Sequence, residues 1–232
     1  GICTGGTGTV SINEGNYIAF HDTTNMAGIF VNDGSPTILG NYIGTNRAGD
    51  DLGNYIGIII AFAADNVTVG SATYGQGNTL GGSDLDCINY YGDAAGTSTI
   101  KGNFIGVSYD AGVWRNLNSN RDGIRIAGAG GLTIGGVSTG GVGTVSIHEG
   151  NYIGFNDTAD GVGIEVADGA SVIKGNYIGT NRAGNDLGNY YGIYLAAGTD
   201  NVVIGGTSYG EANVIGQSEV QQIHCGASSG TQ

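Results

Sequence analysis

Proline and basic residues are scarce in this chain. One proline among 232 residues, and 48 glycines that follow no period of three, exclude a collagen-like triple helix. Seven lysines and arginines against twenty aspartates and glutamates give a net charge of −13, which disfavours binding to the phosphate backbone of nucleic acids. No apolar run has the length of a membrane span. The expected partners therefore include neither nucleic acid nor a bilayer core.

Cysteines are also few: Cys3, Cys87 and Cys225 are too far apart for a zinc knuckle and too few for a disulfide scaffold. What the chain does have is a hydrophobic fraction of 40%, with Ile, Val and Tyr alternating with polar residues in short runs between Gly, Asn and Asp. Such runs are typical of short strands joined by tight turns, and no segment of ten residues carries a helical stripe. The sequence therefore predicts an ordered, all-β protein.

A long internal duplication organises the chain. Residues 9–81 recur without a gap as residues 144–216, so that the phrase Gly-Asn-Tyr-Ile-Gly at 40–44 reappears at 175–179. A shorter Gly-Asn phrase recurs within each copy. Repetition on this scale is typical of stacked units that share their stability with their neighbours.

Read in order, the short strands form a three-strand phrase that occurs seven times, about once per 33 residues. This predicts one β-solenoid domain over residues 1–232, a right-handed parallel β-helix of about seven coils without a capping helix. Alternation predicts two interior columns. On the first strands the column is Ile38, Val69, Ile100, Ile134, Ile173 and Ile204. On the third strands it is Ile29, Ile58, Ile88, Ile124, Ile164, Ile193 and Ile223.

The asparagines of the Gly-Asn phrases are predicted to form a ladder at a corner of the coils. Each side-chain amide would bond to the next coil and satisfy backbone groups that a sharp corner leaves unpaired. The neighbouring glycine would supply a positive φ or a close approach of the backbone. The members of the ladder are Asn16, Asn41, Asn78, Asn103, Asn151, Asn176 and Asn213.

The Gly-Asn-Tyr-Ile-Gly-Thr-Asn and Ile-Gly-Gly phrases resemble those of right-handed parallel β-helices of the pectin-lyase-like superfold, in particular repeats of secreted or surface proteins of bacteria and archaea. The resemblance covers nearly the whole chain, including residues 201–206. It implies the fold and an extracellular or cell-surface location. It implies no single function, because the superfold includes lyases, hydrolases, phage spikes and adhesins.

The best candidates for catalytic residues occupy outward positions of the third strands. They are Asn89, Arg125 and Glu165. A lyase of this fold needs a cationic base and calcium-binding carboxylates, but here one arginine faces a single glutamate. A cross-strand ion pair explains them more simply. The three histidines are replaced in the other copy or at the equivalent position, and no nucleophile with a partnered base can be assigned. We therefore expect no catalytic site, with a polysaccharide-lyase-like enzyme as the alternative.

Acidic segments at residues 32–34, 50–51 and 82–86 could offer oxygen ligands to calcium. None contains the nine-residue phrase of a calcium roll. The expectation is therefore no metal site and no other cofactor, with calcium as the one alternative.

Aromatic side chains gather outside the second strands, in the column Tyr17, Tyr42, Thr79, Phe104, Tyr152, Tyr177 and Val214. Its five aromatic residues would be able to stack on sugar rings or pack against another rod. The alternative is that the loops after Thr45, Val107 and Thr180 fold over the column and bury it.

The two ends of the chain suggest assembly. Ile2, Cys3 and Thr4 resemble the first strand of a coil, and Ile223, His224 and Cys225 resemble a third strand. A second copy stacked head to tail would continue the phrase in register, so the leading interpretation is an extracellular structural subunit that forms a homopolymeric fibre. The alternatives are a fragment of a larger surface adhesin and a carbohydrate-binding or lyase-like β-helix.

Overall fold

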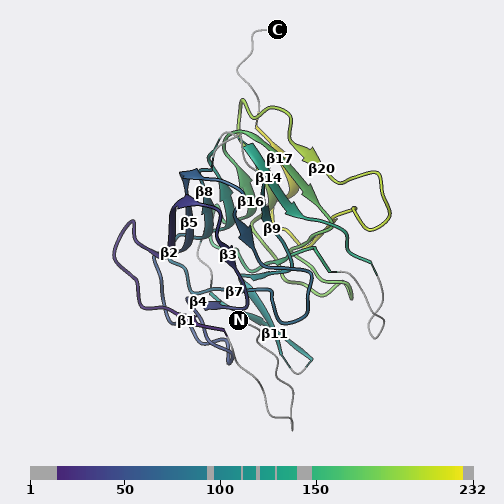
Figure 1. Ribbon diagram of the computed structural model, residues 1–232. Helices are drawn as coiled ribbons and strands as arrows, with labels where there is room; N and C mark the ends of the chain where they lie inside the picture. The colour runs from purple at the N-terminus through teal and green to yellow at the C-terminus, as the bar shows by residue number, and fades with distance from the viewer. Residues whose placement is uncertain are drawn as a thin grey trace.

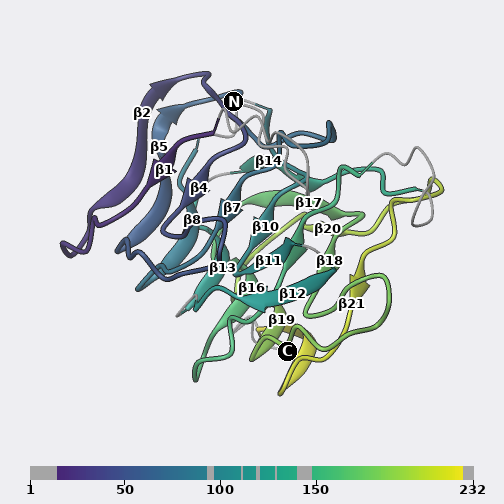
Figure 2. The ribbon, with the colours of Figure 1, turned by 90° about the horizontal axis from the view of Figure 1, so that it is seen from below.

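The computed structural model describes residues 15–92, 97–110, 112–118, 121–128, 130–139 and 148–226. All regular elements in these ranges are β-strands, and most strands belong to three parallel sheets (Figures 1 and 2). Over the same ranges the structure has no helix long and apolar enough to cross a membrane.

Each sheet takes one strand from each successive coil. In spatial order the first sheet contains β3 (Thr37–Ile38), β6 (Thr68–Val69), β9 (Ser98–Ile100), β14 (Gly130–Gly135), β17 (Ala170–Lys174) and β20 (Val203–Ile204). The second sheet contains β1 (Tyr17–Ile18), β4 (Tyr42–Ile43), β7 (Thr79–Leu80), β10 (Phe104–Ile105), β15 (Tyr152–Ile153), β18 (Tyr177–Ile178) and β21 (Val214–Ile215). The third sheet contains β2 (Ala27–Gly34), β5 (Ile56–Ala64), β8 (Asp86–Tyr90), β13 (Asp122–Ile126), β16 (Val162–Val166), β19 (Tyr191–Leu195) and β22 (Gln221–Cys225).

This strand order confirms the predicted parallel β-helix, with seven strands in the second and third sheets. Parallel crossover connections are right-handed in nearly all proteins, which is the winding expected here. One further pair of strands, β11 (Val107–Asp110) and β12 (Val113–Asn116), forms an antiparallel hairpin that projects from the fourth coil.

The interior columns predicted from alternation are confirmed. Ile124 pairs with Ile88 on one side and with Ile164 on the other, and all three side chains are fully buried. Strands of two to five residues have few hydrogen bonds of their own, so burial of these columns between coils supplies much of their stability. At the last strand, β22, the column ends in Ile223, which is 43% exposed.

The asparagine ladder is confirmed as well. Nδ2 of Asn103 donates to Oδ1 of Asn151 at 2.9 Å and to the carbonyl oxygen of Val69 at 2.9 Å. The same amide-to-amide bond joins every successive pair from Asn16 to Asn213. Because the ladder is mostly buried, each bond satisfies groups that water does not reach.

Glycine is required beside the ladder for the two reasons expected. Gly102 has a φ of +67°, a conformation that side chains with a Cβ rarely adopt. Gly150 lies so close to the carbonyl oxygen of Gly175 on the next coil that a Cβ would collide with it. Both residues therefore keep adjacent corners in contact.

A second, shorter ladder precedes the third sheet and was not predicted. Nδ2 of Asn156 donates to Oδ1 of Asn189 at 2.9 Å, and the backbone N–H of Asn156 donates to the same oxygen at 3.1 Å. In the first copy of the duplication, the backbone N–H of His21 donates to Oδ1 of Asn54 at 3.2 Å. These contacts hold the turns that lead into the strands of the third sheet.

Candidate functional site

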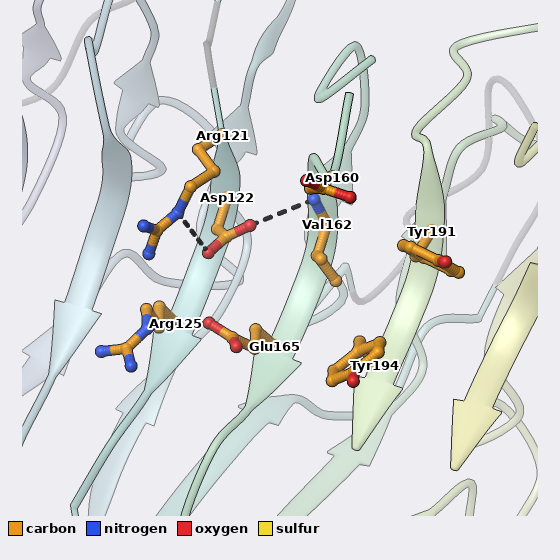
Figure 3. A pocket seen from close by; sticks show the side chains of 8 residues that line it. All are labelled: Arg121, Asp122, Arg125, Asp160, Val162, Glu165, Tyr191 and Tyr194. Atoms are coloured by element: carbon orange, nitrogen blue, oxygen red, sulfur yellow. Dashed lines mark hydrogen bonds and ion pairs between the residues drawn. The ribbon is translucent and has the colours of Figure 1, made fainter. Parts of the chain in front are cut away.

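A pocket of about 510 Å³ opens on the outer face of the third sheet (Figure 3). It lies over β13, β16 and β19 and the turns that precede β13 and β16. Its walls are formed by Arg121, Asp122, Arg125, Asp160, Val162, Glu165, Tyr191 and Tyr194.

One row of pocket residues occupies the outward column that alternation predicts. Arg125 pairs with Glu165, and Glu165 pairs with Tyr194, each directly after an interior isoleucine. The Nε atom of Arg125 lies 2.8 Å from Oε2 of Glu165. The predicted cross-strand ion pair is therefore present.

The other row contains Asp122, Val162 and Tyr191, each two residues before an interior isoleucine. Strict alternation would point these side chains inward. On β13, however, Gly123 separates Asp122 from Ile124 and faces inward. A Cβ at Gly123 would lie 2.8 Å from the side chain of Ile153. The strand turns at this glycine position, so the preceding residue is free to face the pocket.

A pair of buried carboxyl groups lies at one end of this row. Asp86 and Asp122 are direct partners on β8 and β13, and they are 0% and 2% exposed. Burial raises the pKa of Asp86 to about 6, although the charges of Arg121 and Arg125 lower it. Burial raises the pKa of Asp122 to about 8, and the charges of Asp86 and Glu165 act in the same direction. The two groups therefore titrate as a pair that retains a proton at neutral pH.

Arg121 bridges the two carboxyl groups. Its Nε donates to Oδ2 of Asp122 at 3.1 Å, and its Nη2 lies 3.3 Å from Oδ1 of Asp86. The other oxygen of Asp122 accepts the backbone N–H of Val162 at 3.1 Å, and Oδ2 of Asp86 accepts Nδ2 of Asn89 at 2.9 Å. Asn89 lies opposite Arg125 in the register of β8 and β13, as predicted, and its amide bonds to Asp86.

Aromatic rings form the other end of the pocket. Tyr191 and Tyr194 meet edge to face, with ring centroids 5.6 Å apart. The ring of Tyr194 stacks on that of His224 at 4.7 Å with an interplanar angle of 8°. Charged groups and flat rings therefore line one continuous surface (Figure 3).

The predicted aromatic column lies outside the second sheet and is partly covered. Tyr152 stacks between Phe104 at 5.5 Å and Tyr177 at 4.9 Å. Trp114, on the hairpin β11–β12, packs over Tyr152 at 4.9 Å. The loop after Val107 therefore folds over the middle of the column.

The loops after Thr45 and Thr180 contain internal turns. Oγ1 of Thr45 donates to the carbonyl oxygen of Asp50 at 2.9 Å, and Oγ1 of Thr180 donates to that of Asn185 at 2.9 Å. At the end of the column Tyr17 stays 51% exposed. This end of the column remains a possible contact surface.

The residues predicted for end-to-end assembly are divided between two parts of the chain. Ile2, Cys3 and Thr4 lie outside the described residues. Ile223, His224 and Cys225 belong to β22, the last strand of the third sheet.

For metal binding, the described ranges hold no group of three or more His, Cys, Asp or Glu side chains able to bind an ion. Of the three acidic segments considered for calcium, the one at 82–86 contributes Asp86, whose carboxyl group is paired with Arg121. In the segment at 50–51, Oδ2 of Asp50 accepts Nδ2 of Asn46 at 2.8 Å.

No protein-family model matches the chain, and no curated protein and no solved structure is significantly similar to it. Functional inference therefore rests on the geometry of the chain itself.

Proposed function

We propose that the protein is a carbohydrate-binding β-helix whose pocket on the third sheet holds a neutral glycan. The observation that carries the proposal is the joint presence of two tyrosine rings and several fixed polar side chains in one pocket. Sites for small ligands generally combine apolar and aromatic walls with a few oriented polar groups.

The tyrosines supply the apolar part of this surface. A tyrosine ring offers a flat face to the C–H groups of a sugar and a hydroxyl group at its edge. Tyr191 and Tyr194 lie next to Glu165 and Arg125, whose charged groups would hydrogen-bond sugar hydroxyls. Each side chain is carried by a strand of the rigid stack, so little order has to be created on binding.

Charge favours a neutral sugar over a polyanion. The pocket has two arginines, and both are already paired with carboxyl groups. Asp160 adds a further negative charge, and the whole chain carries a net charge of −13. A polyuronate would be repelled by this field. A glycan ligand is compatible with an extracellular or cell-surface location, which we also propose.

The Arg125–Glu165 contact supports binding in preference to lyase chemistry. An arginine that acts as a base must lose its proton, but a carboxylate at 2.8 Å stabilises the charged form. The pair thus fits a structural and ligand-binding role. We propose that the protein acts without a cofactor.

Binding is tested by calorimetry with cellohexaose, xylohexaose and mannohexaose as neutral probes and hexagalacturonate as the acidic probe. The expected result is a dissociation constant in the micromolar to millimolar range for at least one neutral probe, and none for hexagalacturonate. Tyr194→Ala should weaken binding at least about tenfold, or 1.4 kcal/mol. The exposed Tyr74→Ala, on a distant loop, is the matched control. Binding of hexagalacturonate alone, or of no probe, would contradict the proposal.

A second candidate function is head-to-tail stacking into a fibre, as an extracellular structural subunit. The observation that favours it is that the interior column is exposed to solvent at its last strand. Ile223 on β22 is 43% exposed, whereas Ile193 on β19 is fully buried. A second copy that paired with β22 would cover this isoleucine and extend the parallel sheet.

Electron microscopy of the purified protein tests stacking. The account predicts filaments for the wild type and for Ile223→Ala, which keeps the backbone N–H. Ile223→Pro should give short rods, because proline removes a donor and disfavours an added strand. Compact wild-type particles, or filaments of normal length from Ile223→Pro, would reject the candidate.

A further inference from the structure

The guanidinium group of Arg121 is held at the pocket by residues of two strands. Nε is bonded to Asp122 and Nη2 is paired with Asp86. A planar group bound at two points keeps one orientation. Nη1 has no hydrogen bond or ion pair to any residue within the described ranges, and the side chain is 40% exposed. Its remaining donors are therefore available to a ligand in the pocket that Arg121 lines (Figure 3).

The surroundings of the carboxyl pair favour one shared proton. Each oxygen of Asp122 accepts an N–H donor, from Arg121 and from the backbone of Val162. Oδ1 of Asp86 accepts no hydrogen bond from the described residues, and its charged partner is Nη2 of Arg121 at 3.3 Å. Two buried negative charges beside one bridging guanidinium would leave an uncompensated charge, which is costly. One proton held by the pair removes that charge.

Burial and neighbouring charges raise the pKa of Asp122 further than that of Asp86. Because the two groups titrate together, the raised values belong to the pair. The titratable and charged groups that face the pair or line the pocket above it are Arg121, Arg125, Asp160, Glu165, Tyr191 and Tyr194.

We propose that Arg121 recognises hydroxyl groups of the bound sugar, and that Asp86 and Asp122 act as positioning residues for its guanidinium. The inference rests on the proposed glycan-binding function. Paired with a single negative charge, Arg121 is neutralised locally but retains free N–H donors. It can thus bind hydroxyl groups without selecting a carboxylate, which gives the pocket its preference for neutral sugars.

The role of Arg121 is tested with the neutral hexasaccharide that the wild type binds. Arg121→Lys keeps the charge but cannot bridge two carboxyl groups with a planar fork, so affinity should fall at least about tenfold. Arg47→Lys, which changes an arginine on the hairpin side of the molecule, should leave affinity within about twofold. Equal affinity of wild type and Arg121→Lys would overturn the assignment of Arg121 while leaving the glycan site in place.

The positioning roles predict weaker binding for two conservative substitutions. Asp86→Asn replaces the charged partner of Nη2 with a neutral amide, and affinity should fall at least about tenfold. Asp122 accepts N–H donors with both oxygens, so Asp122→Asn turns an NH₂ group toward one of them and should also weaken binding at least about tenfold. Melting temperatures of both variants show whether each is folded. Wild-type affinity in both folded variants would contradict the positioning roles.

The shared proton has a readout that needs no ligand. Carboxyl ¹³C shifts of aspartate side chains, followed by NMR against pH, should show at least one group that titrates with a midpoint near 6 or above. Asp86→Asn should lower the midpoint of Asp122, because it removes the neighbouring negative charge. If all aspartate carboxyl groups titrate at their ordinary values, the shared proton is wrong. A wild type that binds no probe but shows the raised titration would instead reject the glycan function alone.

Discussion

The two copies of the duplicated tract share a core but differ on one outer face. Ile29 and Ile58 of the first copy correspond to Ile164 and Ile193 of the second, and all four lie in the interior column. The outward positions beside them have changed from apolar to polar or aromatic. The outer pairs are Phe30 and Glu165, Ile56 and Tyr191, and Ile59 and Tyr194.

This difference separates the demands of folding from those of the pocket. An interior position of a solenoid meets the coils above and below, so its shape and polarity are fixed by packing. An outer position meets solvent and is free to change. The pocket lies where such changes meet the tract between the copies, residues 82–143, which contributes Arg121, Asp122 and Arg125.

The largest effect is expected from a charge placed in the interior column, where the two copies agree. Ile124→Asp places a carboxylate in the dry interior column without a partner, and should reduce the free energy of unfolding by about 4 kcal/mol or more. Arg125→Ala, at the next residue but on the outer face, should cost about 1 kcal/mol or less. Thermal and urea unfolding measure both. Equal melting of Ile124→Asp and wild type would show that the inward assignment is wrong.

The asparagine ladder allows buried and exposed positions to be compared at a corner of the coils. Asn103→Ala removes the oxygen that accepts the buried backbone N–H of Asn78, and should cost about 2–3 kcal/mol. Asn16, the first described member, is exposed, so Asn16→Ala should cost about 1 kcal/mol or less. Urea unfolding of both variants gives the difference. Equal losses would mean that burial does not set the strength of the ladder.

The carboxyl pair makes the contribution of the outer face to the free energy of unfolding depend on pH. The apolar interior has no such dependence. Folding raises both pKa values above those of an unfolded aspartate, so between about pH 4 and about pH 8 the folded chain binds more protons. The contribution of the pair is therefore fully present at low pH and is lost as pH rises through this window. Asp86→Asn should flatten the slope of unfolding free energy against pH. An unchanged slope would exclude the pair as its source.

The smallest expected effect belongs to the Arg125–Glu165 pair, whose side chains are partly exposed. Glu165→Gln should change the free energy of unfolding by only about 0.5–1 kcal/mol. If the pair is structural, the protein should also leave pectin and alginate intact, with or without calcium. Ultraviolet-absorbing unsaturated products that disappear in Arg125→Ala would instead establish a lyase.

Much of the fold could be predicted because its signal is periodic. The isoleucine columns, the asparagine ladder and the register of the outward column from Phe30 to His224 all repeat with the coil, so each coil supports the interpretation of the others. The Arg125–Glu165 pair followed from the same register.

The carboxyl pair could not be found in this way. Asp86 and Asp122 lie 36 residues apart in the chain and occur in only two of the seven coils, so no repeat reveals them. Strict alternation also points both aspartates inward, and the turn at Gly123 that reorients Asp122 is visible only in the structure. One signal was available: both aspartates stand two residues before an interior isoleucine.

The hairpin was missed for a related reason. Residues 107–116 occupy one coil and have no counterpart in the duplicated copies, so the repeat gave no register for them. The possibility that a loop after Val107 covers the aromatic column was foreseen, but not that Trp114 supplies the contact.

The central claim is that the changed outer face of the second copy binds the sugar. It is tested most directly by returning that face to the residues of the first copy in one variant, Glu165→Phe, Tyr191→Ile and Tyr194→Ile, and measuring its affinity for the neutral hexasaccharide by calorimetry. Phe30→Glu, in the first copy, is the control. The account predicts that the triple variant folds and loses at least about tenfold in affinity, while the control binds like wild type. A folded triple variant with wild-type affinity would contradict the account.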